Sequence, residues 1–296
     1  MPGAESRHIV ENAPAKINLS LRIIGRRADG YHELRSLVVF AQAGDRIVAE
    51  TADDLTLEMR GPFAAALGRE PDNLVLRAAR LLRERTGVKA GARLTLEKNL
   101  PVASGIGGGS ADAAATLRAL TRLWGVEPGI AALTEMAASL GADVPVCLDA
   151  RPALMWGTGA KLARLDALPR FHLVLVNPGL ALPTGDVFRA LAAPALETEP
   201  AAPNIPVFAS LDDLTGWLAG EPNDLQAPAT RLAPEIGAAH AALADSKDCR
   251  LARMSGSGAT CFGIYEQEAA ARSAAAAVAQ AHSGWWAVAC GVSDCG

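Results

Sequence analysis

The sequence predicts an α+β protein built from two lobes. Three observations lead to this prediction: the chain has 296 residues, its first third alternates apolar and polar residues as strands do, and the same pattern restarts near residue 171 after a helical middle. Domains usually hold about 100 to 200 residues, so a chain of this length is expected to form two. We place the boundary at about residue 160, with an N-terminal lobe of residues 1–160 and a C-terminal lobe of residues 161–296.

The N-terminal lobe is expected to begin as a sheet. Residues 15–24 alternate strictly, with Lys16, Asn18 and Ser20 on one side and apolar residues on the other, which predicts a strand with one polar face. Apolar residues at helical spacing, each run followed by a stop, predict helices after the first strands. The further strands are expected at residues 34–40, 45–50, 55–59 and 93–98, and the helices from Asp72 to Gly87 and at about 110–124 and 130–140.

The C-terminal lobe is expected to repeat this mixture of strands and helices. Residues 171–176 form an apolar β run that Asn177-Pro178-Gly179 closes. Residues 192–206 are rich in Ala, Pro and Glu without periodicity, which predicts an exposed loop. The remaining elements are expected to be helices at about 224–242 and 268–282 and strands at 250–254, 260–265 and 285–290.

Composition and charge exclude several classes of function. The net charge of -4 and the lack of a Lys/Arg block argue against nucleic acid as a partner. No apolar run reaches the ~18 residues that a membrane span needs, and residues 1–10 have no apolar core, so we expect neither a membrane protein nor a signal or transit peptide. The cysteines show no C-x-x-C pair, which favours reduced thiols and a cytoplasmic protein. They are Cys147, Cys249, Cys261, Cys290 and Cys295.

A glycine-rich segment between the strand at 93–98 and the helix at 110–124 carries the strongest functional signal. Its sequence from residue 101 is P-V-A-S-G-I-G-G-G-S-A-D-A-A. Glycines let the backbone approach a ligand, and the amides of a helix start attract phosphate. It is not a Walker A loop, because no Lys-Ser/Thr follows the last glycine, and its spacing does not fit the dinucleotide fingerprint. A glycine turn that only begins a buried helix stays possible. The expected phosphate-binding residues are Pro101, Val102, Ala103, Ser104, Gly105, Ile106, Gly107, Gly108, Gly109 and Ser110.

Three further segments combine charge or glycine with apolar surroundings. Residues 13–18 read A-P-A-K-I-N, residues 140–146 read L-G-A-D-V-P-V, and residues 253–260 read R-M-S-G-S-G-A-T. Asp143 would be costly in such a setting unless it is paired or functional. Simpler interpretations are a solvated strand face, an aspartate that caps a turn, and a glycine connection between strands.

Together these motifs resemble those of the GHMP kinases, a family that includes homoserine, mevalonate and galactose kinases. The resemblance implies a two-lobe α+β fold, with an N-terminal lobe of the ribosomal protein S5 domain 2-like type and a C-terminal α/β sandwich lobe. It also implies ATP with Mg²⁺, Asp143 as general base and Lys16 beside the acceptor hydroxyl. The other implied residues are Ser110 on Mg²⁺, Asn73 and Lys98 near the adenine, and a second glycine loop of Ser255, Gly256, Ser257 and Gly258 near the phosphates.

The acceptor is indicated by R-A-D-G-Y-H at residues 27–32. Asp29-Gly30 predicts a turn that places Tyr31 and His32 at the start of a strand. The motif resembles that of the family members that phosphorylate diphosphocytidyl-methylerythritol, which implies that Tyr31 and His32 hold the cytosine. Phe188, in P-T-G-D-V-F, is implied to stack on the ring, and Asn18 and Thr184 to contact the substrate.

The sequence also leaves alternatives to this acceptor. Several relatives carry an aromatic residue where this chain has Val38, so the cytosine wall differs here. A homoserine or mevalonate type of kinase, or a nucleotide-binding regulator without catalysis, remain open at this point. So does the choice between a monomer and a homodimer.

Overall fold

The computed structural model describes residues 8–67 and 73–293, and its contacts divide the chain into two compact units. The first unit combines Met1–Ala15, Gly44–Val102 and Gly107–Asp149, and the second combines Lys16–Ala43, Ala103–Ile106 and Ala150–Gly296. Each unit is therefore assembled from separate segments of the chain, whereas the sequence predicts two lobes that follow one another. The boundary at residue 160 stays a prediction.

Strands and helices are mixed throughout the chain, so the predicted α+β class is confirmed. Among the described residues, no helix has the length and apolar character needed to span a bilayer. The strands are β1 (His8–Asn18), β2 (Arg22–Arg26), β3 (His32–Ala52), β4 (Leu55–Arg60), β5 (Gly91–Glu97), β6 (Ala153–Gly157), β7 (Lys161–Arg164), β8 (His172–Asn177), β9 (Leu251–Met254), β10 (Cys261–Tyr265) and β11 (Trp286–Gly291). The helices are α1 (Leu74–Thr86), α2 (Gly108–Trp124), α3 (Ile130–Leu140), α4 (Val144–Cys147), α5 (Thr184–Leu191), α6 (Leu211–Gly220), α7 (Gln226–Leu232), α8 (Glu235–Ala244) and α9 (Glu268–Ala281), with a 3₁₀ turn at Ala64–Leu67.

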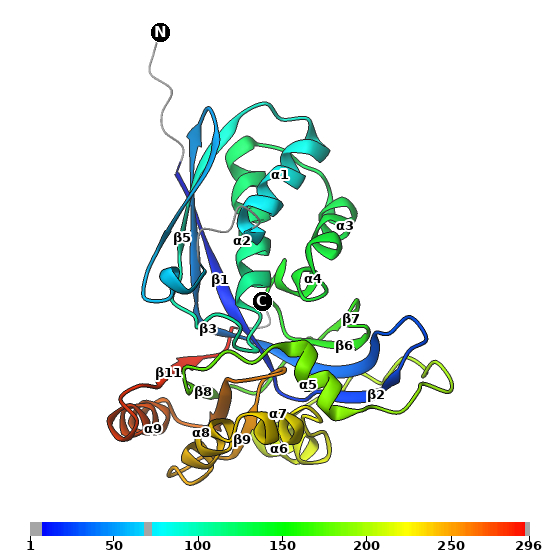
Figure 1. Ribbon diagram of the computed structural model, residues 1–296, viewed down its shortest axis with the longest axis vertical. Coiled ribbons are helices and arrows are strands. Elements are labelled where there is room, and N and C mark those ends of the chain that lie inside the picture. The colour runs from blue at the N-terminus through cyan, green and yellow to red at the C-terminus, as the bar shows by residue number, and fades with distance from the viewer. Residues whose placement is uncertain (1–7, 68–72, 294–296) are drawn as a thin grey trace. The chain divides into compact units, whose positions relative to one another are not determined.

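In the first unit, strands and helices form two layers (Figure 1). The second half of β3 pairs antiparallel with β5, and β5 pairs parallel with β4 through the crossover that contains α1. Asn73 begins α1 by accepting a hydrogen bond from the Val75 amide, and Gly87 ends it in the left-handed conformation. Alanines 111, 113, 114, 115 and 119 are buried along α2, which packs on α1. These small side chains let α2 lie deep in the unit.

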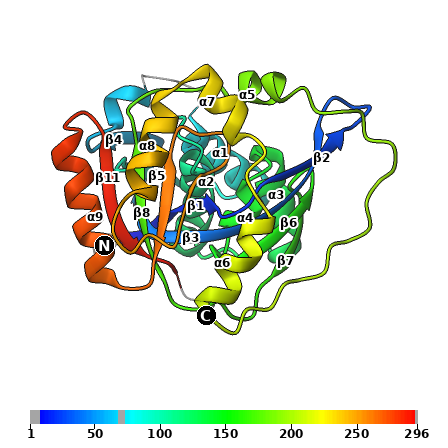
Figure 2. The same cartoon turned by 90° about the horizontal axis from the view of Figure 1, so that it is seen from below.

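In the second unit, a four-stranded antiparallel sheet has the order β11-β8-β10-β9. Helices α8 and α9 pack on it, and Figure 2 shows α9 running beside β11. The first half of β3 belongs to this unit as well, where it pairs with β2 and β6. The core between sheet and helices is built from small and branched apolar side chains such as Val174, Val176, Ile236 and Val278.

Most predicted elements are present, and three differ for physical reasons. The strands expected at 34–40 and 45–50 are one strand, β3, because the backbone stays extended between them. The strand expected at 15–24 is interrupted after Asn18 and resumes at Arg22. The helix expected at 224–242 is two helices, since Pro234 has no amide hydrogen to continue α7.

Other elements escaped the sequence reasoning or match it. β6, β7, α4, α5, α6 and the 3₁₀ turn at Ala64–Leu67 were not predicted. The loop at 192–206 is confirmed as irregular and largely exposed. Asp72, the residue expected to precede the first helix, lies outside the described residues, as does Cys295.

Candidate active site

The glycine-rich segment connects β5 to α2 and passes through both units, since residues 103–106 group with the second unit and the flanking residues with the first. Helix α2 begins at Gly108, after Gly107 in the left-handed conformation with φ 64°, and no side chain among the described residues caps this end. The first amides of a helix have no partner within the helix and carry partial positive charge. The start of α2 therefore suits an anion such as phosphate.

A buried ion triad lies beneath the first turn of α2. The Lys98 ammonium donates to Asp45 Oδ2 at 2.5 Å and to Asp112 Oδ2 at 2.8 Å. Asp45 Oδ1 accepts the amides of Asn99 and Leu100, which fixes the chain as it enters the glycine loop. A Cβ on Gly108 would lie 3.1 Å from Lys98 Nζ, so the helix start rests directly on this triad.

Burial and mutual charge shift the pKa values of two members of this triad, Asp112 and Lys98. Burial raises the pKa of Asp112 and the neighbouring Asp45 raises it further, while Lys98 opposes the shift. Burial alone would lower the pKa of Lys98, but the two carboxylates more than offset it and the net shift is upward. Two buried carboxylates that share one ammonium group repel each other, and protonation of one of them removes this repulsion. Asp112, whose Oδ1 is buried without a hydrogen-bond partner among the described residues, is the better proton site.

In the second unit, residues 104–106 of the glycine-rich segment pack against the second glycine loop, residues 255–258. Ser255 Oγ donates to the Gly105 carbonyl at 3.1 Å and accepts the Asn18 amide at 3.0 Å. The Thr260 amide donates to the Ser104 carbonyl at 3.1 Å, and the Lys16 amide to the Ile106 carbonyl at 2.9 Å. The A-P-A-K-I-N and S-G-S-G motifs, far apart in sequence, thus meet at residues 104–106.

The predicted polar face of the first strand is buried, with Lys16, Asn18 and Ser20 only 3%, 4% and 1% exposed. The Asn18 amide group donates to Ser36 Oγ at 2.7 Å. A solvated strand face, the simpler interpretation of this segment, is therefore wrong. Burial on this scale requires specific partners for each polar group.

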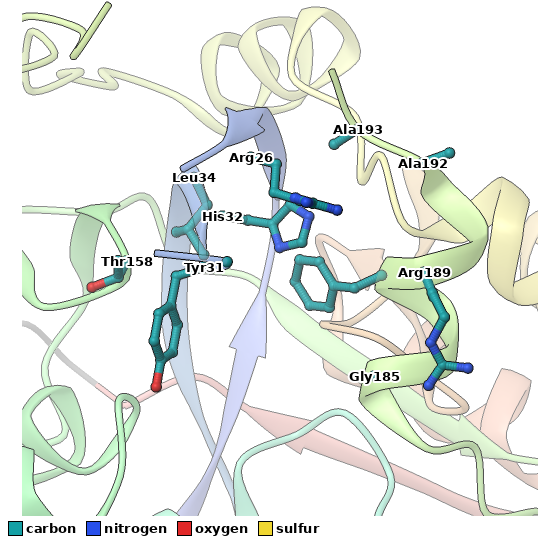
Figure 3. Close-up of a pocket in the computed structure, with 11 residues that line it drawn as sticks. Arg26, Tyr31, His32, Leu34, Thr158, Gly185, Arg189, Ala192 and Ala193 are labelled. Atoms are coloured by element: carbon teal, nitrogen blue, oxygen red, sulfur yellow. The ribbon is translucent and has the colours of Figure 1, made fainter. Parts of the chain in front are cut away.

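A pocket of about 570 Å³ opens beside the turn at Asp29-Gly30 (Figure 3). Tyr31, His32, Phe188, Arg26 and Arg189 line it. The rings of His32 and Phe188 lie 4.7 Å apart at 36°, and Tyr31 is 67% exposed. Figure 3 shows Arg26 beside His32, with Tyr31 and Arg189 on different sides of the imidazole. Three of the side chains expected to bind the base therefore line one pocket, two of them in ring contact.

The environment of His32 favours the neutral imidazole. Burial lowers its pKa, and the charge of Arg26 lowers it further. A neutral imidazole has one donor and one acceptor nitrogen. It can therefore recognise an uncharged base by hydrogen bonds.

The remaining predicted residues fall into separate places. Thr184 is exposed at the start of α5, and its hydroxyl shares a hydrogen bond of 2.8 Å with Ser257 Oγ. This bond joins the P-T-G-D-V-F segment to the second glycine loop. Asn73 is the N-cap of α1. Asp143 is half-buried at the start of α4, and its side chain does not cap that helix. Lys16 groups with the second unit and Asp143 with the first, so their approach to one hydroxyl stays a prediction.

Sequence reasoning missed two residues that organise these motifs, Asp45 and Asn223. Asn223 is 5% exposed, and its side-chain amide donates to the carbonyls of Met254 and Gly256 at 2.8 Å each. Asp45 supports the loop from a neighbouring strand. No local pattern singles out either residue, since Asp45 lies in a strand that also contains Arg46 and Glu50.

The fold, the glycine motifs and the pocket are those of a small-molecule kinase, and the chain belongs to the GHMP kinase family. The family model of the GHMP kinases N terminal domain matches residues 73–151, and that of the GHMP kinases C terminal matches residues 204–284. Among curated relatives, the 4-diphosphocytidyl-2-C-methyl-D-erythritol kinase of Parvibaculum lavamentivorans is 64% identical over 278 residues, which cover 94% of this chain and 96% of the relative. The enzyme of that name from Rhodospirillum rubrum is 49% identical over 291 residues, covering 97% and 92%.

Solved structures give the same family. A crystal structure of 4-(cytidine 5'-diphospho)-2C-methyl-D-erythritol kinase matches with a TM-score of 0.76 and 39% identity, covering 96% of this chain and 99% of the other. Homoserine kinase from Cytophaga hutchinsonii matches with a TM-score of 0.68 at 17% identity, covering 99% and 96%. The second likeness shows the shared fold alone.

Proposed function

We propose that this chain transfers the γ-phosphoryl group of ATP to the 2-hydroxyl of 4-diphosphocytidyl-2-C-methyl-D-erythritol, a step of non-mevalonate isoprenoid precursor biosynthesis. The observation that carries the proposal is the pocket in which Tyr31, His32 and Phe188 offer rings and a neutral imidazole to a pyrimidine. Relatives that are 64% and 49% identical over almost the whole chain bear the name of this kinase. Both arguments select the same acceptor within the family.

The glycine loop and the start of α2 bind the ATP phosphates in this proposal. The uncapped amides of residues 108–110 attract the phosphate oxygens, and the triad of Asp45, Lys98 and Asp112 holds the turn that presents them. Asn73 and Lys98 border the adenine. Ser255, Gly256, Ser257 and Gly258 support the loop at Gly105, whose carbonyl accepts a hydrogen bond from Ser255 Oγ.

The residues at the start of α2 would accept a Mg²⁺ ion that accompanies the nucleotide. No cluster of three or more His, Cys, Asp or Glu side chains that could hold a metal occurs in the described part of the chain. The donor set instead offers the Ser110 hydroxyl at the phosphate-binding end of α2, which fits a cation held mainly by phosphate oxygens and water. The ion would supply charge neutralisation at the transferring phosphoryl group.

Asp143 and Lys16 act on the acceptor. Asp143 accepts the proton of the 2-hydroxyl, and Lys16 stabilises the negative charge that develops on the oxygen. Asn18 and Thr184 contact the methylerythritol end of the substrate. We place the protein in the cytoplasm, where ATP is available and where the cysteines would stay reduced.

The test is ADP release with three acceptors side by side: diphosphocytidyl-methylerythritol, homoserine and mevalonate. Turnover is expected with the first alone. Turnover by Asp143→Asn is expected to be about 10² to 10⁴-fold lower, because a general base typically accelerates a reaction by this factor. Asp149→Asn, exposed just beyond α4, is the matched control and should retain activity. Near-wild-type turnover by Asp143→Asn would remove the assigned base, and nucleotide binding without turnover on any acceptor would favour a regulator.

A further inference from the structure

Arg118, in the middle of α2, forms hydrogen bonds that connect α2 with α4 and β1 in the first unit. Its Nη1 donates to the carbonyls of Cys147 and Leu148 at 2.9 and 3.1 Å. Its Nη2 donates to the Asn12 carbonyl at 2.6 Å, and its Nε donates to Glu11 Oε2 at 3.0 Å. One planar guanidinium therefore links α2 to the end of α4 and to β1.

The helix that receives these hydrogen bonds is too short to fix its own position. Helix α4 spans only Val144–Cys147, and Pro145 within it has no amide hydrogen. A single turn is unstable alone, because ordering it costs more than its few hydrogen bonds return. Its last carbonyls also lack partners within the helix. The burial of residues 144–147 and the Arg118 hydrogen bonds together hold α4 in place.

Asp143 is the residue from which α4 starts. It is the N-cap of this turn, so any shift of the turn moves its carboxyl group. The hydrogen bonds of Arg118 are at the opposite end of the turn, to the carbonyls of Cys147 and Leu148. Beyond Asn12, the β1 strand runs on to Lys16.

We propose that Arg118 is a positioning residue for Asp143: by holding the carboxyl end of α4, it fixes the place from which Asp143 accepts the proton of the acceptor. This inference rests on the proposed role of Asp143 as general base. Arg118 touches neither nucleotide nor acceptor in this scheme and acts only through α4.

The next arginine along α2 provides a matched control. Arg122 binds the same carboxylate as Arg118, with its Nη1 2.6 Å from Glu11 Oε1, but its side chain is 62% exposed. Its hydrogen bond and ion pair among the described residues are with Glu11 and not with α4. Arg122→Met therefore changes charge, length and helix propensity in the same way as Arg118→Met while leaving α4 untouched.

The experiment measures kcat and the KM for ATP in purified full-length variants. Arg118→Met is expected to lower kcat by about 10- to 100-fold, the effect of moving a reacting group by roughly 1 Å, with the KM for ATP unchanged. Arg118→Lys keeps the charge but cannot reach all the carbonyl acceptors, so it should fold and show a smaller loss. Arg122→Met should equal the wild type. A wild-type kcat in both Arg118 variants would overturn the proposal.

A double-mutant cycle separates positioning from a general structural effect. If Arg118 acts through Asp143, the Arg118→Met loss in kcat should vanish in the Asp143→Asn background. Equal losses in both backgrounds would overturn the proposal while leaving the base assignment intact. Should Arg118→Met fail to fold, the cycle with Arg118→Lys gives the same decision. Failure of the proposed function is seen separately, since Asp143→Asn alone would then keep its turnover.

Discussion

Replacement of Lys98 by methionine tests the buried triad beneath α2. The side chains of Lys98, Asp45 and Asp112 are 2%, 0% and 4% exposed, so the substitution leaves two carboxyl groups buried without their cation. Removing one partner from a buried ion pair costs about 3–5 kcal/mol, because the remaining charge is uncompensated. Methionine has a similar length and fills the space of the Lys98 stem. The decrease in the free energy of unfolding should therefore be electrostatic in origin. It is a large fraction of the roughly 5–15 kcal/mol that usually stabilises a folded protein.

Urea unfolding followed by circular dichroism measures this loss. Lys161→Met is the control, since Lys161 pairs with Glu199 at 2.8 Å but the two side chains are 53% and 60% exposed. An exposed pair contributes about 0–1 kcal/mol. Replacing both aspartates by asparagine alongside Lys98→Met should recover part of the stability, because no charge is then buried. A loss for Lys98→Met as small as that for Lys161→Met would refute the reasoning.

Two further perturbations test the neighbouring groups. Burial and Asp45 raise the pKa of Asp112 to about 8, against about 3.9 for a free aspartate, so the folded protein binds a proton that the unfolded chain releases. The stability that this proton confers is full below about pH 4 and is lost as the pH rises to about 8. Unfolding at pH 5, 7 and 9 should therefore show the wild type losing stability relative to Asp112→Asn, whose side chain does not titrate, and parallel curves for the two proteins would contradict this. Phe188→Ala removes the ring 4.7 Å from His32 and should raise the KM for the cytidine substrate about 5- to 50-fold with an unchanged KM for ATP, whereas equal effects on both would argue against a base site.

Local patterns in the sequence predicted the elements whose causes are local. The Asn73 cap and the Gly87 stop bound α1, and the glycines before Ser110 mark the start of α2. The turn at Asp29-Gly30 places His32 at the first position of β3, as its sequence indicates. In each case the residues that determine the structure are neighbours along the chain, so their spacing in the sequence is sufficient to predict the element.

Residues whose partners are remote in sequence could not be found in this way. Asp45 supports Lys98 and the loop from another strand, and Asn223 holds the backbone of Met254 and Gly256. Neither contact corresponds to a periodic pattern of residues in the sequence. Asp112 is a similar case, because its hydrogen-bond partner is the buried ammonium of Lys98, which precedes the glycine loop.

The glycines of the phosphate loop were expected to admit a ligand, but the structure gives two of them different reasons. A Cβ on Gly105, where φ is +74°, would lie 2.5 Å from the Ser255 carbonyl oxygen and 2.7 Å from the Gly258 amide nitrogen. The protein's own backbone therefore occupies the space beside Gly105. Gly109 is helical and exposed, and among the described residues its Cβ would meet only Leu74 Cδ1, at 3.4 Å.

The two alanine substitutions should consequently have opposite effects. Gly105→Ala should lower the free energy of unfolding by at least the roughly 1–2 kcal/mol of a left-handed non-glycine residue, with the backbone overlap in addition. Gly109→Ala should raise it by up to about 1 kcal/mol, because alanine favours the helix, while weakening ATP binding if phosphate lies against that turn. Thermal unfolding and calorimetric titration with ATP measure the two effects. An unchanged ATP affinity in Gly109→Ala would place the phosphates elsewhere, and a fully stable Gly105→Ala would contradict the packing of the two glycine motifs.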